Sequence, residues 1–506
     1  MSTLLLWMVT LPTLAAVFCL AAPERLSKLI ALGSSLAGLL LAVVLYNEFD
    51  ASNAANMQFL YLAPWISQYQ IHFGLGVDGL SFPLVLLSKF MMPIAIAASW
   101  NQTHRVRAFM ACFLLLDTAM TGTFLATDIF LFYVFWELAL IPMVLIVGVW
   151  GSSERVYAAI KFFLITFAGS LLMLVAIFWV FMAHQEQYGF YSAEIRSFYS
   201  LSWNHNLTYF GLAAPEWIFL AFAIAFCIKI PLFPLHTWLP DAHTQAPTGG
   251  SILLAAVMLK MGTYGILRFC VPITPDAFHI FAPYLATLGL VGILYGAWVA
   301  FQQADVKKLV AYSSVSHVGF IVLGICAMNP EALTGAMLQM VNHGLSTGAL
   351  FFLIGALYER RHSRQLSDFG GLAKQIPWFA FFLVFVSASS MGVPGLNGFV
   401  GEFLILLGSF KANAIWGCVG VLGVIFAAVY MLWMLRGVLW GPLSSEENKK
   451  LTDLNWREAL CLSALGVFII WLGVYPKPFI DKMRASLESY WKQGPTVITM
   501  KVDENL

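Results

Sequence analysis

The sequence predicts an all-α membrane protein with about fourteen transmembrane helices, and three observations support that class. Of its 506 residues, 60% are hydrophobic and only 10% are charged, and the mean hydropathy is +0.81. Soluble domains carry roughly 25% charged residues. The apolar residues form runs long enough to cross a hydrocarbon layer about 30 Å thick. Two of these runs are interrupted by proline and glycine, which indicates discontinuous helices.

The predicted helices follow one another through short loops. They lie near residues 3–21, 29–47, 80–99, 108–125, 128–150, 156–183, 212–243, 248–270, 277–301, 306–328, 331–358, 377–410, 413–440 and 457–475. The N-terminus lacks the basic residues of a signal peptide, so the first run is expected to remain as the first span.

The basic residues of the loops predict an orientation. One alternate set of loops carries Arg25, Lys28, Arg105, Arg107, Arg155, Lys307, Lys308, Arg360, Arg361, Arg364, Lys374, Arg436, Lys449, Lys450 and Arg457. The other set carries only Arg196, Arg268 and Lys411. Because cytoplasmic loops are enriched in Lys and Arg, the first set is expected on the cytoplasmic side and both termini outside.

The seventh predicted helix is the costliest part of the chain. Lys229 directly follows the apolar run AFAIAFCI, and a charge at that depth costs about 2.5 to 3.5 kcal/mol. Pro231, Pro234 and Pro240 then lack the N–H groups that would continue the helix. A membrane helix tolerates such a break only beside protein or water. A broken helix with a buried cation is typical of ion carriers.

A second break, at 392–398 in the twelfth helix, suggests an internal repeat. Corresponding breaks in two halves are a sign of inverted-repeat transporters. The sequence therefore predicts two inverted five-helix repeats, at 108–270 and 277–440. A three-helix segment at 1–107 precedes them, and a helix with a tail at 441–506 follows.

Ionisable residues inside the predicted spans are the candidate functional groups. They are Lys89, Asp117, Glu137, Lys161, Lys229, Lys260, His317, His343 and Glu402. Some have structural explanations. Lys89 and Lys161 could extend toward the membrane surface, and either histidine could be a satisfied interior group. Asp117 could bond a hydroxyl on a neighbouring helix.

Four of these residues are too costly to be incidental. Glu137, Lys229, Lys260 and Glu402, if charged and unpaired, would cost on the order of 10 kcal/mol together. Pairing offsets that cost, and Glu137 with Lys229 is the expected ion pair. A lysine whose partner moves away can release its proton, which is a usable element of a pump. A static ion pair is the alternative.

Other chemistries have no support in the sequence. The seven cysteines are scattered singly without a CxxC pair, which excludes a disulfide framework and common zinc or iron–sulfur spacings. His236, Asp241 and His243 are expected to line a wet cavity rather than to bind metal. The segment GLGVDG at 74–79 matches GxGxxG but follows no predicted strand, so dinucleotide binding is rejected. The sequence contains no basic stripe, so nucleic-acid binding has no support.

Four long motifs carry a resemblance to a known family. KIPLFPLHTWLPDAHTQAPTGGSILLAAVMLKMGTYG, SSMGVPGLNGFVGEF, FYVFWELALIPM and GVDGLS resemble the antiporter-like membrane subunits of respiratory complex I, the proton-pumping NADH:quinone oxidoreductase, and of multisubunit cation/proton antiporters. The resemblance covers nearly the whole chain. It implies that Glu137 and Lys229 form the pumping pair, Lys260 is the central lysine, His317 and His343 lie on the connecting polar axis, and Glu402 is the exit-side group.

The resemblance also implies a setting for the chain. It implies no cofactor in this chain, with NADH and quinone chemistry in other subunits of the membrane arm, among them two sister antiporter-like subunits. The location would be a bacterial cytoplasmic (inner) membrane. The expected function is proton translocation driven by redox chemistry in those partners. Two alternatives stay open: a subunit of a sodium/proton antiporter, and a non-conducting scaffold of the membrane arm.

Overall fold

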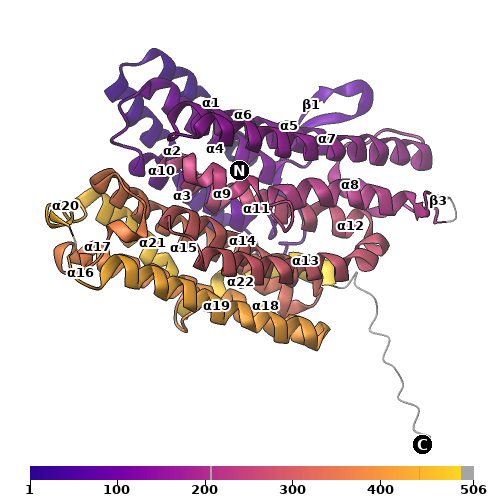
Figure 1. Ribbon diagram of the computed structural model, residues 1–506. Coiled ribbons are helices and arrows are strands. Elements are labelled where there is room, and N and C mark those ends of the chain that lie inside the picture. Colours follow the sequence, from indigo (N-terminus) through magenta and orange to yellow (C-terminus); the bar gives the residue numbers. More distant parts are fainter. Residues whose placement is uncertain (206–207, 444, 492–506) are drawn as a thin grey trace, which may run out of the picture.

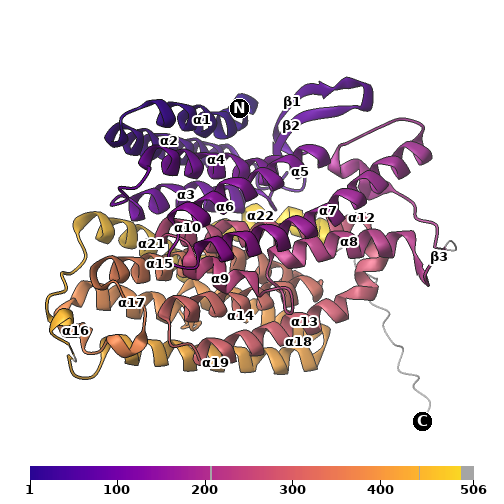
Figure 2. The same cartoon turned by 45° about the horizontal axis from the view of Figure 1, so that its top comes forward.

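The computed structural model describes residues 1–205, 208–443 and 445–491. Most of these residues are helical, and eleven of their helices are long and apolar enough to cross a membrane. The long helices lie side by side as a bundle, with the N-terminal helices on one flank and the C-terminal helices on the other (Figures 1 and 2). The prediction of a multi-pass helical membrane protein is thus confirmed.

The helices of the first half follow the predicted apolar runs. They are α1 (Ser2–Ala21), α2 (Glu24–Glu48), α3 (Phe82–Ala98), α4 (Val106–Leu125), α5 (Ile129–Leu138), α6 (Leu140–Trp150), α7 (Arg155–Tyr188), α8 (Ala214–Lys229), α9 (Trp238–Gln245), α10 (Thr248–Leu253), α11 (Leu259–Gly265) and α12 (Val271–Ile273). Two π-helical turns, η3 (Leu254–Met258) and η4 (Ile266–Cys270), join α10, α11 and α12 into one continuous rod.

The second half continues the bundle. Its helices are α13 (Pro275–Phe301), α14 (Val306–Cys326), α15 (Pro330–Arg361), α16 (Leu372–Gln375), α17 (Pro377–Ser390), α18 (Asn397–Ala412), α19 (Ala414–Leu439), α20 (Glu446–Lys449), α21 (Trp456–Val474) and α22 (Lys477–Trp491). Short 3₁₀ turns are η1 (Ser67–Tyr69), η2 (Ile195–Ser200) and η5 (Leu366–Asp368).

Two helices of the bundle begin in the same way. The Asp128 carboxylate caps α5 by accepting hydrogen bonds from the backbone N–H groups of Phe130 and Leu131. The Asp305 carboxylate caps α14 through Lys307 and Lys308 in the same manner. Such caps satisfy N–H groups that the first helical turn leaves unpaired. Each aspartate also forms an isolated β-bridge just before a 3₁₀ turn, at Glu194 before η2 and at Gln365 before η5.

The helix breaks lie where the prolines and glycines predict them. Helix α8 ends at Lys229 and α9 begins at Trp238. The freed carbonyl of Cys227 accepts a hydrogen bond from the Leu232 N–H at 2.9 Å, and that of Ile228 accepts one from the Trp238 indole at 2.9 Å. The protein itself therefore satisfies the backbone at this break, as membrane burial requires.

The break between α17 and α18 depends on glycine. Gly392 and Gly395 have φ angles of +73° and +91°, which only glycine adopts readily. Helix α18 then restarts at Asn397, five residues before Glu402. Both discontinuous segments thus have a candidate functional residue close to their break.

Two β-hairpins were not predicted. Strands β1 (Gln58–Ile66) and β2 (Ile71–Val77) pair antiparallel, as do the short strands β3 (Thr208–Tyr209) and β4 (Leu212–Ala213). The GLGVDG segment, residues 74–79, therefore forms the second half of strand β2 and the turn after it, where the sequence predicted no strand. That strand belongs to a two-stranded hairpin rather than a parallel βαβ unit, so dinucleotide binding stays without support. Both hairpins lie at one end of the bundle (Figure 2).

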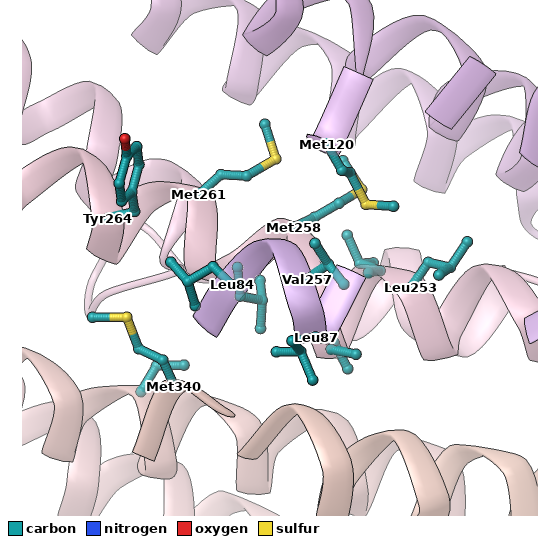
Figure 3. Close-up of a cluster of buried hydrophobic side chains, with 14 of the residues drawn as sticks. Leu84, Leu87, Met120, Leu253, Val257, Met258, Met261, Tyr264 and Met340 are labelled. Atoms are coloured by element: carbon teal, nitrogen blue, oxygen red, sulfur yellow. The ribbon is translucent and has the colours of Figure 1, made fainter. Parts of the chain in front are cut away.

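The centre of the bundle is the rod formed by residues 248–273. The apolar window of this rod is entirely buried. Its side chains Val257, Met258 and Met261 pack beside Leu84 of α3 and Met340 of α15 (Figure 3). The rod therefore holds whatever polar side chains it carries in a dry, close-packed setting, where unpaired charge is costly.

Candidate functional site

Lys260 lies on α11, in the buried central rod. Its side chain is 1% exposed. The Nζ atom donates a hydrogen bond to the Ala255 carbonyl at 2.5 Å and lies 2.6 Å from Nδ1 of His343 on α15. The Ala255 carbonyl belongs to the π-helical turn η3, and such turns occur frequently at functional sites. Lys260 thus contacts a titratable ring and no carboxylate among the residues that the structure describes.

A second buried contact continues this row. Nδ1 of His317 on α14 lies 2.8 Å from Oε1 of Glu402 on α18. The Gln339 amide donates to the same carboxylate oxygen at 2.9 Å, and the Tyr430 hydroxyl lies 3.2 Å from Nε2 of His317. The His317 and His343 rings are 5.8 Å apart between centroids. We call Lys260, His343, His317 and Glu402 the central row.

The central row retains unused hydrogen-bonding capacity. Nε2 of His343, Oε2 of Glu402 and Oε1 of Gln339 are buried and have no partner. Buried polar groups in proteins are nearly always hydrogen-bonded to protein or to ordered water. The row therefore offers places for water between groups that can each accept and release a proton. Four of the six predicted site residues are brought together here, from four different helices.

Glu137 and Lys229 do not form the predicted ion pair. Lys229 is 2% exposed, and its ammonium lies 5.0 Å from the centre of the Trp136 ring, a cation–π contact. Oε1 of Glu137 is buried without a hydrogen-bond partner. The two charges attract each other, but no ion-pair contact joins the ammonium to the carboxylate. Both residues lie at helix ends, at the end of α8 and near the end of α5.

Lys89 and Asp117 form a closed ion pair that the sequence did not reveal. The ammonium and carboxylate are 3.0 Å apart and are 0% and 1% exposed. Lys89 also donates to the Met8 carbonyl at 2.9 Å, and the Thr121 hydroxyl donates to Asp117 at 3.3 Å. The prediction that Lys89 extends to the membrane surface is wrong, because α1, α3 and α4 enclose its side chain. The expected hydroxyl donor to Asp117 comes from Thr121 on the same helix, α4, and not from a neighbouring helix as predicted.

Lys161 and the residues around the α8–α9 break have separate environments. Lys161 forms a 2.7 Å ion pair with Asp241, with side chains 24% and 31% exposed. His236 stacks on Phe233. His243 is fully buried against the ring of Phe351, with both ring nitrogens unpartnered. The expectation that His236, Asp241 and His243 line a shared wet cavity stays a prediction.

Arg268 was expected in a loop but lies inside the rod. Its side chain is 1% exposed, and its guanidinium donates to Asp78 at 2.7 Å and to the Tyr264 hydroxyl at 3.0 Å. Arg196 binds the other Asp78 oxygen at 2.9 Å. Burial raises the pKa of Asp78, but the Arg268 and Arg196 guanidinium groups outweigh burial and lower it to about 2. This cluster fixes the rod to the loop after β2.

A polar cavity of about 480 Å³ opens near the start of α14. It is lined by Ala98, Ser99, Asn101, Gln102, Phe109, Trp150, Gly151, Ser152, Gln245, Ala246, Pro247, Thr248, Lys307, Ile354, Gly355, Tyr358, Glu359, His362 and Arg364. Lys307, expected as a loop charge, is 7% exposed, and its ammonium donates to the Ala246 carbonyl at 2.5 Å. His243 lies three residues before that carbonyl.

Metal binding has no geometric basis in the part of the chain that the structure describes. No three His, Cys, Asp or Glu side chains there converge as ligands for an ion. The chemistry available to the central row is therefore that of proton exchange between nitrogen and oxygen atoms, for which contacts of 2.6–2.8 Å are suitable.

The chain matches two protein families along most of its length. Residues 126–427 match the family described as NADH:quinone oxidoreductase/Mrp antiporter, transmembrane. Residues 52–125 match the amino terminus of NADH-ubiquinone oxidoreductase chain 4.

Individual relatives agree with these matches. The chain is 42% identical over 472 residues to NADH-quinone oxidoreductase subunit M of Rhodobacter capsulatus, covering 92% of this chain and 90% of the relative. It is 38% identical over 488 residues to NADH-ubiquinone oxidoreductase chain 4 of Arabidopsis thaliana, covering 96% of each.

Solved structures show the same fold. A chain of respiratory complex I from Thermus thermophilus with bound NADH aligns with a TM-score of 0.86 and 30% identity, covering 97% of this chain and 99% of that one. A chain of the Mrp complex from Dietzia sp. aligns with a TM-score of 0.82 at 19% identity, which shows likeness of fold alone. The predicted resemblance is confirmed, and the chain belongs to the NADH:quinone oxidoreductase/Mrp antiporter family of membrane subunits.

Proposed function

We propose that this chain moves protons across the membrane as a subunit of an NADH:quinone oxidoreductase complex. The observation that carries the proposal is the central row, in which Lys260, His343, His317 and Glu402 lie in sequence across four helices. Uncompensated buried titratable groups are expensive, and in membranes they mark ion and proton pathways. The names of the relatives and of the complex I chain support the same activity.

The contacts suggest a route through the chain. Protons enter the polar cavity next to Lys307, pass the unpartnered ring of His243, and reach Lys260. From there the central row leads to Glu402, the exit-side group. Glu137 and Lys229 act on the row from the α8 break. A shift of either helix end changes how strongly the Glu137 carboxylate attracts the Lys229 ammonium, and this changes the proton affinity of Lys229.

The driving energy comes from partner subunits in this proposal. Moving one elementary charge against 100 mV costs about 2.3 kcal/mol. Rearranging a few buried charges by about an ångström supplies energies of that size, since charge interactions are strong where water is excluded. NADH and quinone chemistry would take place elsewhere in the complex, next to two sister antiporter-like subunits, and this chain would bind no cofactor.

The finer architecture belongs to the same proposal. Besides the eleven long spans, α3, the broken pair α8–α9 and the broken pair α17–α18 would cross a bacterial inner membrane, giving fourteen crossings with both termini periplasmic. The inverted repeats at 108–270 and 277–440 are supported by the matching caps of α5 and α14, at Asp128 and Asp305.

Sodium transport is the second candidate function. The fold likeness to a chain of the Mrp complex keeps it open, because the family includes Mrp antiporters. It requires a sodium site of converging oxygen ligands. The central row instead offers three nitrogen-containing side chains and one carboxylate.

The test distinguishes the two ions directly. The complex that contains this chain is reconstituted in liposomes and given NADH and quinone, while internal pH and ²²Na⁺ uptake are recorded. Acidification of the lumen that persists without sodium is the expected result. Sodium uptake in proportion to NADH oxidation, together with loss of acidification in sodium-free buffer, would favour the antiporter function instead.

A further inference from the structure

An apolar groove on the flank of the bundle ends beside two cations, Arg457 and Lys28, that form no ion pair among the described residues. The groove has a volume of about 610 Å³, within the range of ligand-binding pockets. It is lined by α2, α3 and α21 through Leu32, Leu36, Leu39, Phe90, Pro93, Ile94, Ala97, Trp100, Asn101, Asn455, Trp456, Arg457, Leu460, Cys461 and Ala464. The three helices leave the groove open along its length.

The groove continues along α2 into a second apolar cavity. That cavity, of about 280 Å³, shares Leu39 and Phe90 with the first and extends to Tyr46. From Leu32 to Tyr46 the helix rises about 21 Å, which exceeds half of a hydrocarbon core of about 30 Å. The combined groove is thus long enough to hold an extended hydrocarbon chain from one membrane surface past the midplane.

Two cations meet at the open end of the groove. The Arg457 guanidinium makes one long contact, from Nη2 to Oδ1 of Asn101 at 3.5 Å, and its Nε is buried without an acceptor. Lys28 donates to the Trp100 carbonyl at 2.6 Å and lies close enough to Arg457 for the two charges to repel. An anion between them would remove the repulsion and complete the hydrogen bonding of Arg457.

Neither nearby glutamate forms an ion pair with Arg457, although both line a small cavity with it. Glu458 binds the Arg360 guanidinium at 2.5 Å, and Glu359 accepts a hydrogen bond from the neutral Asn101 amide at 2.8 Å. Glu24 attracts Lys28 but forms no ion pair with it. Trp456, 79% exposed, stands beside the cations, and exposed tryptophan is enriched where hydrocarbon meets headgroups.

We propose that this groove binds an anionic phospholipid, with one acyl chain along α2 and the phosphate between Arg457 and Lys28. Pairing of an apolar slot with a cationic end at the membrane surface matches that ligand class and no soluble anion. Each cation near the phosphate is expected to change the affinity of the groove for an anionic lipid about fivefold. The site lies on the flank, outside the central row.

The test uses the intact complex in nanodiscs. Phosphatidylglycerol or phosphatidylcholine carrying a photoreactive group on one acyl chain is added at equal amounts, and labelled peptides are identified by mass spectrometry. We expect α2, α3 and α21 to be labelled about fivefold more by phosphatidylglycerol. Arg457→Gln should reduce that ratio toward one, whereas Arg155→Gln, an exposed cation at the start of α7, should leave it unchanged.

A second variant tests the hydrocarbon part of the site. Ala464→Trp fills the groove and should reduce labelling of α21 by both lipids. Equal labelling by the two lipids in the unmodified complex, or crosslinks from the groove to another subunit in place of lipid, would overturn the proposal. Neither outcome depends on proton movement, so this experiment and the test of the proposed function can fail independently.

Discussion

The buried lysines of this chain differ in what neutralises them. Lys89 has the Asp117 carboxylate and a backbone carbonyl, so its charge is balanced within a closed ion pair. Lys260 has the ring nitrogen of His343 at 2.6 Å. A hydrogen bond between two nitrogens needs one donor and one acceptor, so the pair cannot be fully protonated on both sides. Lys260 and His343 therefore share a proton that can be passed on.

Neutralising Glu137 should stop proton movement through this chain without preventing assembly. Glu137→Gln keeps the size of the side chain and an oxygen that can accept from the Ser170 hydroxyl, while removing the carboxylate charge that attracts Lys229. We expect NADH-driven acidification of liposomes to fall by the share that this chain carries, and an unchanged subunit composition by native mass spectrometry. Glu154→Gln, an exposed carboxylate before α7, is the control and should pump normally. Normal pumping by an assembled Glu137→Gln complex would refute the assigned role.

At the scale of elements, helices α15 and α18 carry two members of the central row, His343 and Glu402, and pack closely together. They approach so closely that a Cβ at Gly335 would lie 2.6 Å from the backbone nitrogen of Ile405 and 2.8 Å from the carbonyl of Gly401. Backbone atoms cannot move aside as a side chain can. The position of Glu402, next to Gly401, thus depends on a glycine on the neighbouring helix.

Gly335→Ala should therefore destabilise the chain and impair pumping together. Overpacking of this kind costs about 1 to 3 kcal/mol, so we expect a lower midpoint of thermal unfolding in the detergent-solubilised complex. Gly33→Ala on α2 is the matched control, because a Cβ there meets nothing within 4 Å. That substitution should be neutral or stabilising by up to about 1 kcal/mol. Equal unfolding midpoints for the two variants would contradict the packing argument.

The sequence predicted the helices far better than the contacts between them. Apolar runs, and prolines and glycines inside them, depend on local chemistry, so the broken segments could be placed near Lys229 and Glu402. The hairpin β1–β2 was not predicted, because its first strand, QFLYLAPWI, mixes polar and apolar residues and contains a proline, which weakens a strand pattern. Lys89 and Asp117, 28 residues apart, could be paired only once α3 and α4 were placed in space.

For the site, residue types were predictable and partners were not. Lys260, His317, His343 and Glu402 stand out as polar groups in apolar helices. That they meet depends on how α11, α14, α15 and α18 pack, which no local pattern encodes. Glu137 and Lys229 do attract each other, as expected, but the ammonium lies over the neighbouring Trp136 ring and makes no ion-pair contact with the carboxylate.

At the scale of the whole molecule, the central row joins the two halves of the bundle. Lys260 belongs to the buried rod of the first half, and His317, His343 and Glu402 belong to helices of the second. A proton crossing the chain along this route must pass the contact between Lys260 and His343. Removing that contact should therefore block transport wherever the proton enters.

The most direct test is the number of protons moved per NADH oxidised in a Lys260→Met complex. The control is the double variant Lys89→Met, Asp117→Leu, which removes a buried ion pair outside the row and replaces both partners with apolar groups. We predict that the control keeps the proton yield of the unmodified complex while Lys260→Met lowers it by the share that this chain carries. An unchanged yield in an assembled Lys260→Met complex would contradict the account.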